Sequence, residues 1–111
     1  MKLSFYYCDT KLGDLEKTEK GYMYTSNIAG EQKLKNQGAV TDSEYSLWNS
    51  FKREKKILFP EFEHIIYRCR REDIMEMAGI DPNDSRWGKL VKLSSLNFLS
   101  GFHLKQSNET S

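Results

Sequence analysis

The sequence has few cysteines, and it has no long hydrophobic run. Its two cysteines, Cys8 and Cys69, lie far apart and form no CxxC motif, so we expect free buried thiols in a reducing, cytoplasmic environment. No apolar segment approaches the roughly 18–20 residues of a membrane-spanning helix. The first residues also lack the apolar stretch and small-residue cleavage site of a signal peptide. These absences predict an intracellular protein that does not use a membrane.

An excess of charge of one sign is also lacking, because 17 Lys and Arg residues nearly balance 16 Asp and Glu residues. The formal net charge of +1 provides no global field that would attract nucleic acid or a membrane surface. Aromatic residues, in contrast, make up 13% of the chain, which indicates either a dense core or an adhesive surface. The 111 residues fit one domain, which we assign to residues 1–103, followed by a flexible polar tail over residues 104–111.

Three short segments at the N-terminus alternate apolar and polar side chains, as strands do. They span residues 2–8, 12–16 and 22–25. Leu12 and Leu15 are three residues apart rather than two, so Gly13 marks a bulge or a close backbone approach. Gly21 can adopt the positive φ of a tight turn before the third segment. The pattern therefore predicts a three-stranded antiparallel meander.

The spacing of apolar residues becomes helical after the meander. Asn27 and Gly38 are expected to cap a helix over residues 28–36. Thr41 and Glu44 have the spacing of a capping box, which predicts a second helix that runs to about residue 56. This second helix would have an apolar side that consists of Leu47, Trp48 and Phe51.

Further helices are predicted in the C-terminal half. Residues 61–70 have an apolar face of Phe62, Ile65, Ile66 and Cys69. A short helix over residues 74–78 would end at Gly79, and a last helix would start at Pro82 and extend to Phe98. Strands followed by three to five helices are typical of the α+β class.

Residues that could perform catalysis or bind a metal are few and scattered. The candidate metal ligands are Cys8, His64, Cys69 and His103, and no helical spacing aligns His64 with Cys69. No recognisable motif couples a Ser or Cys nucleophile to a histidine, and no glycine-rich loop has phosphate-binding spacing. We therefore predict that the protein is not an enzyme and uses no cofactor and no metal.

Two groups of residues remain as candidates for binding a macromolecule. The first group is basic and consists of Lys52, Arg53, Lys55, Lys56, Arg68, Arg70 and Arg71. On one face these residues could bind nucleic acid, but the acidic residues interleaved with them are also typical of a solvated helix face. The second group consists of residue types that protein interfaces favour, namely Tyr6, Tyr22, Met23 and Tyr24. This second group is either partner-binding or part of the core, and the sheet edge could also accept a strand from another chain.

The segment FYYCDTKLGDLEKTEKGYMYTS also carries a family resemblance. Its Leu12-Gly13-Asp14-Leu15 and Gly21-Tyr22-Met23-Tyr24 stretches resemble the N-terminal subdomain of HipA-like toxin kinases over about residues 3–28. The Leu-Ser-Leu-Pro segment that usually follows is missing, and so is the kinase core, so no kinase activity is implied. Some related systems encode this subdomain as a separate small antitoxin that binds the kinase. The resemblance therefore implies a HipS-like antitoxin or kinase partner.

Together, these observations predict a small non-enzymatic protein-binding module that regulates or inhibits a partner enzyme by stoichiometric binding. Two alternatives remain open. One is a phage or mobile-element inhibitor of a host defence nuclease, and the other is a small nucleic-acid-binding regulator that uses the basic clusters.

Overall fold

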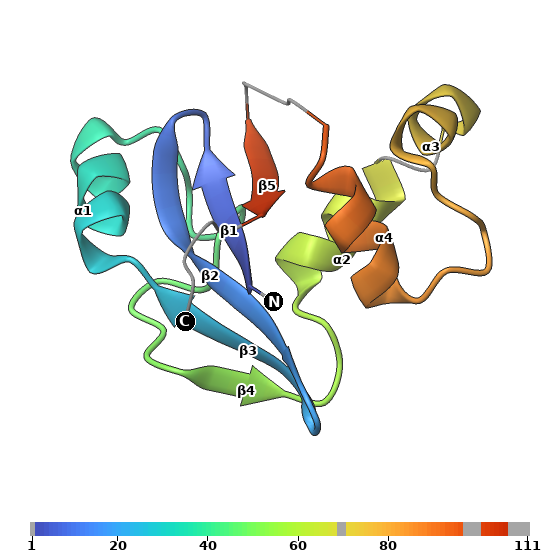
Figure 1. Cartoon of the computed structure of the whole chain (residues 1–111). Coiled ribbons are helices and arrows are strands. Elements are labelled where there is room, and N and C mark those ends of the chain that lie inside the picture. The colour runs from blue at the N-terminus through green and yellow to red at the C-terminus, as the bar shows by residue number, and fades with distance from the viewer. Residues whose placement is uncertain (1, 69–70, 97–100, 107–111) are drawn as a thin grey trace.

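The computed structural model describes residues 2–68, 71–96 and 101–106, and these form five strands and four helices (Figure 1). The elements are β1 (Lys2–Tyr7), β2 (Thr10–Thr18), β3 (Gly21–Ser26), α1 (Ile28–Gln37), β4 (Arg53–Lys55), α2 (Pro60–Arg68), α3 (Glu72–Ala78), α4 (Arg86–Leu93) and β5 (Phe102–Gln106). The strands form one antiparallel sheet in the order β4-β3-β2-β1-β5. This α+β fold contains the predicted N-terminal meander, and it adds an edge strand on each side.

The two glycines that the sequence singled out have the predicted roles in the meander. The register between β1 and β2 shifts because Phe5 pairs with Gly13 whereas Tyr6 pairs with Lys11. A Cβ on Gly13 would overlap the Tyr24 ring, so both a bulge and a close approach are confirmed. Gly21 has a φ of 147°, which side chains other than glycine rarely tolerate, and it allows β2 to reverse into β3.

The hydrophobic core lies between one face of the sheet and the helices. Phe5 of β1 is 1% exposed, and its ring centroid lies 4.9 Å from that of Phe62 on α2. The predicted apolar face of α2 is confirmed for the described residues, since Phe62 and Ile65 are buried, whereas Cys69 lies outside the described residues. Leu34 of α1 belongs to the same core cluster. Burial of one such side chain contributes about 1.5–3 kcal/mol, so this cluster is the main source of stability.

The helix predicted from Thr41 to about residue 56 does not form, and this prediction is wrong. Residues 41–50 are irregular, with turns at 42–44 and 48–49, and β4 follows them. Only half of the capping box is present, because the Glu44 carboxylate accepts from the backbone N–H and the hydroxyl of Thr41, each at 3.0 Å. These hydrogen bonds lower the pKa of Glu44. Asn49 and Lys52 have φ values of 56° and 57°, which end any right-handed helix.

Tertiary contacts explain why this segment prefers the sheet to a helix. The Ser26 N–H at the end of β3 donates to the Ser50 carbonyl at 2.7 Å, and the Ser50 N–H donates to the Ser26 hydroxyl at 2.8 Å. Tyr45 and Leu47 are both buried in the core, on this irregular stretch. The local helical signal of the capping box is therefore overridden by pairing and burial.

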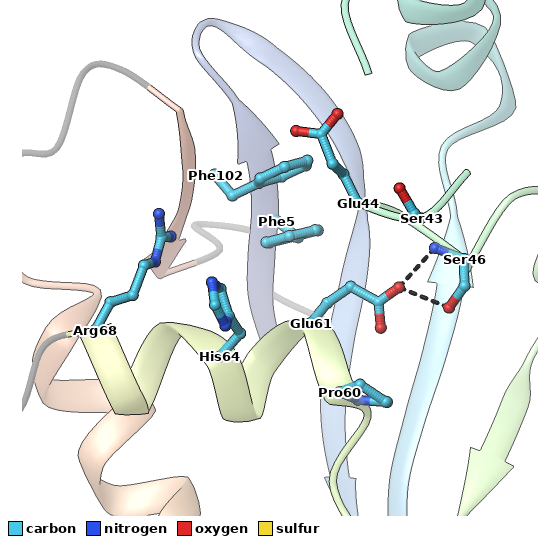
Figure 2. Close-up of a pocket in the computed structure, with 9 residues that line it drawn as sticks. All are labelled: Phe5, Ser43, Glu44, Ser46, Pro60, Glu61, His64, Arg68 and Phe102. Carbon is cyan, nitrogen blue, oxygen red and sulfur yellow. Dashed lines mark hydrogen bonds between the residues drawn. The ribbon is translucent and has the colours of Figure 1, made fainter. Parts of the chain in front are cut away.

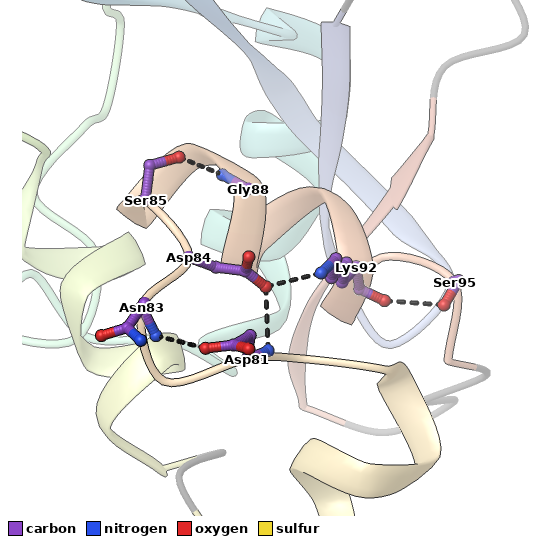
Figure 3. A network of polar contacts seen from close by, with 7 residues as sticks. All are labelled: Asp81, Asn83, Asp84, Ser85, Gly88, Lys92 and Ser95. Carbon is purple, nitrogen blue, oxygen red and sulfur yellow. Dashed lines mark hydrogen bonds and ion pairs between the residues drawn. The ribbon is translucent and has the colours of Figure 1, made fainter.

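The last helix begins later than predicted. The Ser85 hydroxyl accepts from the Gly88 N–H at 3.0 Å and caps α4, whereas Pro82 lies in the preceding turn. In that turn the Asp84 carboxylate accepts from the Asp81 N–H at 2.9 Å and from the Lys92 ammonium at 2.6 Å (Figure 3). The Lys92 hydrogen bond is the main reason why the pKa of Asp84 is lowered. The caps predicted at Asn27, Gly38 and Gly79 are confirmed, and Phe98 lies outside the described residues.

The C-terminal strand β5 was not expected. Residues 102–106 pair with β1, and Leu104 is 3% exposed opposite Phe5. Residues 104–106, which we assigned to a flexible tail, therefore belong to the sheet, because the apolar Phe102 and Leu104 alternate with polar neighbours as in a half-buried strand. Residues 107–111 of that predicted tail lie outside the described residues.

Candidate functional site

Two of the strand residues predicted to bind a partner lie in the core instead. Tyr24 has no exposed surface and Tyr22 is 9% exposed. The Tyr24 ring lies 5.7 Å from that of Phe62, and the Tyr22 ring lies 6.3 Å from that of Trp87 on α4. A side chain without exposed surface cannot contact a partner of the folded protein. Of the two alternatives that the sequence left open, Tyr22 and Tyr24 therefore take the core role.

The Tyr24 hydroxyl belongs to a buried polar network that joins β3, α1 and the 41–50 segment. It lies 2.9 Å from the Tyr45 hydroxyl, which in turn donates to the Glu31 carboxylate. Glu31 is 2% exposed and also accepts from the Ser26 hydroxyl at 2.7 Å and the Asn49 N–H at 2.9 Å. Burial raises the pKa of both tyrosines far above the usual value, so they stay neutral donors. These groups form hydrogen bonds with one another, and the network holds β3, α1 and the 41–50 segment together.

The other two strand candidates, Tyr6 and Met23, are half-buried on the opposite face of the sheet. The Tyr6 ring stacks on His103 at 5.6 Å between centroids, and the Lys105 ammonium lies 4.9 Å from the Tyr6 centroid. Burial lowers the pKa of His103. Met23 pairs across the sheet with Glu16 and Glu54, so charged side chains surround it. This face therefore offers isolated apolar groups rather than a continuous apolar patch.

The first basic cluster forms an exposed edge of the sheet. β4 pairs with β3 on one side, and no strand in the described part of the chain pairs with its other side. Every residue from Lys52 to Lys56 is exposed. Glu54, the only acidic residue among these five, accepts a hydrogen bond from the Thr18 hydroxyl at 2.9 Å. Four cations therefore dominate this edge.

Two large apolar side chains flank this strand. Phe51 is 84% exposed and Ile57 is 73% exposed. We call the segment from Phe51 to Ile57 the β4 edge. The prediction that Phe51 lies on the apolar side of a helix is wrong, because Phe51 lies in a bend that precedes β4 and Lys52 has a φ of 57°. Alternation alone could not have identified either side chain as exposed, since the charged residues between them fit a helix surface equally well.

The second basic cluster does not join the first. Arg68 ends α2 and lines a cavity beside Phe5 and Phe102, whereas Lys56 lines a different cavity beside Tyr22. The two cavities adjoin different strands, β1 and β5 in one case and β3 in the other. Arg71 is paired with Asp73 at 3.2 Å, and Arg70 lies outside the described residues. The structure therefore does not unite the described members of the two clusters into one basic face.

The cavity beside Arg68 is a further concave site among the described residues. It has a volume of about 420 Å³ and is bounded by α2 on one side and by the turn at residues 43–46 on the other. Figure 2 shows His64 and Arg68 rising from α2 toward Phe5 and Phe102. The Glu61 carboxylate, also on α2, accepts from the N–H and the hydroxyl of Ser46 at 2.6 and 2.7 Å. The cavity thus combines aromatic walls with charges of both signs.

The described residues contain no metal-binding cluster and no membrane-spanning helix. No group of three or more His, Cys, Asp or Glu side chains among them could hold a metal ion, and Cys69, one of the four candidate ligands that the sequence offered, lies outside the described residues. None of the described helices has the length and apolar character needed to cross a membrane. Comparisons with known proteins give no match to a family model, to a curated protein or to a solved structure. The relation to HipA-like kinases therefore stays a prediction.

Proposed function

We propose that the protein is a non-enzymatic binding module that docks an acidic, extended segment of a partner protein along the β4 edge. The observation that carries this proposal is the exposed, basic edge strand with an exposed apolar side chain at each end. In this mode the partner adds a strand to the sheet, and main-chain hydrogen bonds provide affinity.

Charge supports an acidic partner. Lys52, Arg53, Lys55 and Lys56 are all exposed, and the intervening Glu54 is engaged by Thr18. A row of lysines on an edge strand repels a second copy of the same edge, which hinders self-association. Carboxylates on a partner strand would reverse that repulsion and would steer the encounter.

The flanking apolar side chains support a protein partner over nucleic acid. Phe51 and Ile57 expose surface whose burial against a protein partner is favourable. The aliphatic Ile57 has no planar face on which a nucleic-acid base could stack, whereas Phe51 has one. The four cations of the β4 edge could neutralise only a few phosphates, because Arg68 lies beside other strands. A nucleic-acid-binding regulator is therefore the alternative outcome of the test below.

The regulatory part of the proposal is stoichiometric occlusion or positioning of the partner. The resemblance of residues 3–28 to the HipA-like subdomain makes a kinase the first partner class to test, in the manner of a HipS-like antitoxin. A phage or mobile-element inhibitor of a host nuclease would bind in the same stoichiometric way. The two possibilities differ in which protein is captured, a kinase or a nuclease.

The test compares the wild type with a Lys52→Glu/Lys56→Glu variant in affinity capture at physiological ionic strength. Both lysines are exposed, so we expect the fold to be unaffected. A Lys33→Glu/Lys35→Glu variant carries the same charge change on exposed residues of α1, outside both candidate groups, and is the control. We expect one dominant protein with the wild type and the control, and its loss with the β4 variant.

Two results would refute the proposal. One is the absence of any stably captured protein, and the other is capture that the β4 reversal leaves unchanged. If nucleic acid is recovered instead, with an affinity that falls steeply as salt increases, the alternative is the correct function.

A further inference from the structure

The edge strand β5 carries a buried histidine that plays no part in the β4 edge. His103 is 2% exposed, and its Nε2 atom is buried without a hydrogen-bond partner among the described residues. We propose that His103 makes the attachment of β5 to β1 sensitive to pH, so that protonation of its imidazole in mild acid releases β5 from the sheet. This inference does not depend on the proposed function.

The hydrogen bond at the other ring nitrogen fixes the uncharged form of His103. Its Nδ1 atom lies 3.0 Å from the Gly101 carbonyl, which can only accept, so Nδ1 carries the proton of the neutral ring. The same carbonyl accepts from the Cys8 N–H at 3.0 Å, so the imidazole is held where the chain enters β5 beside the end of β1. A second proton on the ring therefore has to bind at Nε2.

Protonation of Nε2 creates a charged donor in a position that offers no acceptor. Nε2 is buried, so water does not solvate the new N–H group while β5 stays in place. An unpaired charged group costs far more to bury than a neutral acceptor does. Burial is accordingly the main cause that lowers the pKa of His103, and it outweighs the opposing effect of the hydrogen bond to Gly101. The proton therefore favours an open state in which the imidazole reaches water.

The charged groups on the same face of the sheet do not compensate this cost. On β5 itself, the Lys105 ammonium lowers the pKa of His103 further. On β1, the neutral Tyr6 ring stacks on the imidazole, and Lys11 of β2 is the next residue across the sheet. Asp14 of β2 is already paired with Lys11 at 3.1 Å. No group of three or more potential metal ligands in the described part of the chain includes His103.

The position of β5 allows it to leave the sheet while the other strands stay paired. Among the described strands it pairs only with β1, at the edge opposite β4 (Figure 1). The pairs between β1 and β2, β2 and β3, and β3 and β4 do not involve it. Release moves Leu104, which is 3% exposed, from the core to water, so apolar burial holds β5 in place at neutral pH. Release also leaves β1 with an unpaired edge.

Amide hydrogen exchange at about pH 7.5 and about pH 5 tests the inference, because these values bracket the ordinary histidine pKa of about 6.5 and leave carboxylates mostly ionised. The pKa of His103 is lowered in the closed state, so the closed state is most stable above about pH 6.5 and loses stability as pH falls below it. After correction for the intrinsic exchange rate at each pH, we expect the protection of residues 102–106 to fall in acid. The protection of β2 and β3 should stay the same.

Variants separate His103 from the other histidine of the chain. His103→Asn keeps a side-chain N–H donor near the place of Nδ1 but cannot be protonated, so we expect it to abolish the pH dependence of β5 protection. The matched control His64→Asn removes an exposed imidazole on α2, and the pH dependence should be that of the wild type.

If His103→Asn does not fold, the imidazole NMR signals of the wild type test the same claim. We expect His103 to stay neutral at a pH where the exposed His64 is already protonated, and its protonation to coincide with loss of the native β5 signals. The inference is overturned if β5 protection is equal at the two pH values, or if β2 and β3 lose protection together with β5. It is also overturned if His103→Asn keeps the wild-type pH dependence, or if His103 becomes protonated while β5 stays paired with β1.

Discussion

Strands β3 and β4 are neighbours in one sheet, yet they carry opposite kinds of side chain. Tyr24 of β3 has no exposed surface, whereas its direct cross-strand partner Arg53 of β4 is exposed. β3 is paired on both sides and packs against α2 and α4, while β4 is paired on one side only. The difference shows that membership of the sheet does not determine whether a strand is buried. Position at the edge alone does not determine it either, because the other edge strand, β5, buries Leu104.

The comparison also separates two uses of polar groups. The hydroxyl of Tyr24 and the carboxylate of Glu31 are both buried, and both form hydrogen bonds with the Tyr45 hydroxyl. These hydrogen bonds stabilise one conformation of the chain. The cations of the β4 edge are exposed, so they contribute little to stability and are available to a partner.

Alanine substitution at the paired positions Tyr24 and Arg53 should give very different changes in stability. Tyr24→Ala leaves a cavity in the core, and we expect it to lower the free energy of unfolding by about 3–5 kcal/mol. Arg53→Ala should change it by less than about 0.5 kcal/mol. Urea-induced unfolding, followed by circular dichroism, measures both. Equal losses would show that β4 is as much a part of the core as β3.

The network around Glu31 should be nearly as sensitive. Glu31→Gln removes the negative charge that three donors share, and we expect a loss of about 1–3 kcal/mol in the free energy of unfolding. The exposed Glu19→Gln removes the same charge in the turn before β3 and serves as the control. If both variants unfold at the same urea concentration, Glu31 does not organise the 41–50 segment.

Alkaline pH should destabilise the buried network that contains Tyr24 and Tyr45. The pKa values of Tyr24 and Tyr45 are raised in the folded state, so the stability that these groups contribute is complete below the unfolded-state pKa of about 10 and decreases as pH rises above it. We expect thermal unfolding temperatures to fall above about pH 10. In Tyr45→Phe this fall should be shallower. A wild type whose stability is flat over that range would contradict the buried network.

Truncation of the two flanking apolar side chains should have the smallest effect on stability. Phe51→Ala and Ile57→Ala remove exposed groups, so we expect changes within about 0.5 kcal/mol in the free energy of unfolding. Both should weaken partner capture, which is read from the same affinity experiment as the charge reversal. A large destabilisation would show that these side chains pack in the folded protein.

Much of the meander could be predicted from the sequence because its signals are local. Gly13 and Gly21 have backbone roles that only glycine fills, and the alternation in 2–8 identifies the core face of β1. The caps at Asn27, Gly38 and Gly79 are also local and were found correctly. The α+β class followed from the order of these elements.

The edge strands could not be predicted because non-local pairing determines them. The capping box at Thr41 favours a helix, but hydrogen bonds between Ser26 and Ser50 favour the sheet. The basic residues of the candidate site were identified from the sequence, whereas their exposed apolar neighbours were not, since the exposure of Phe51 depends on the bend before β4. The role of the β3 tyrosines could not be predicted either, because alternating aromatic residues are typical both of a core strand and of an interface strand.

The central claim is that a partner docks along the β4 edge, and amide hydrogen exchange of the complex tests it most directly. Strand addition would pair the outer side of β4, so the account predicts new protection at residues 53–55 when the captured partner is bound, with β5 unchanged. New protection confined to β5, or to α2 and the turn at residues 43–46, would contradict it.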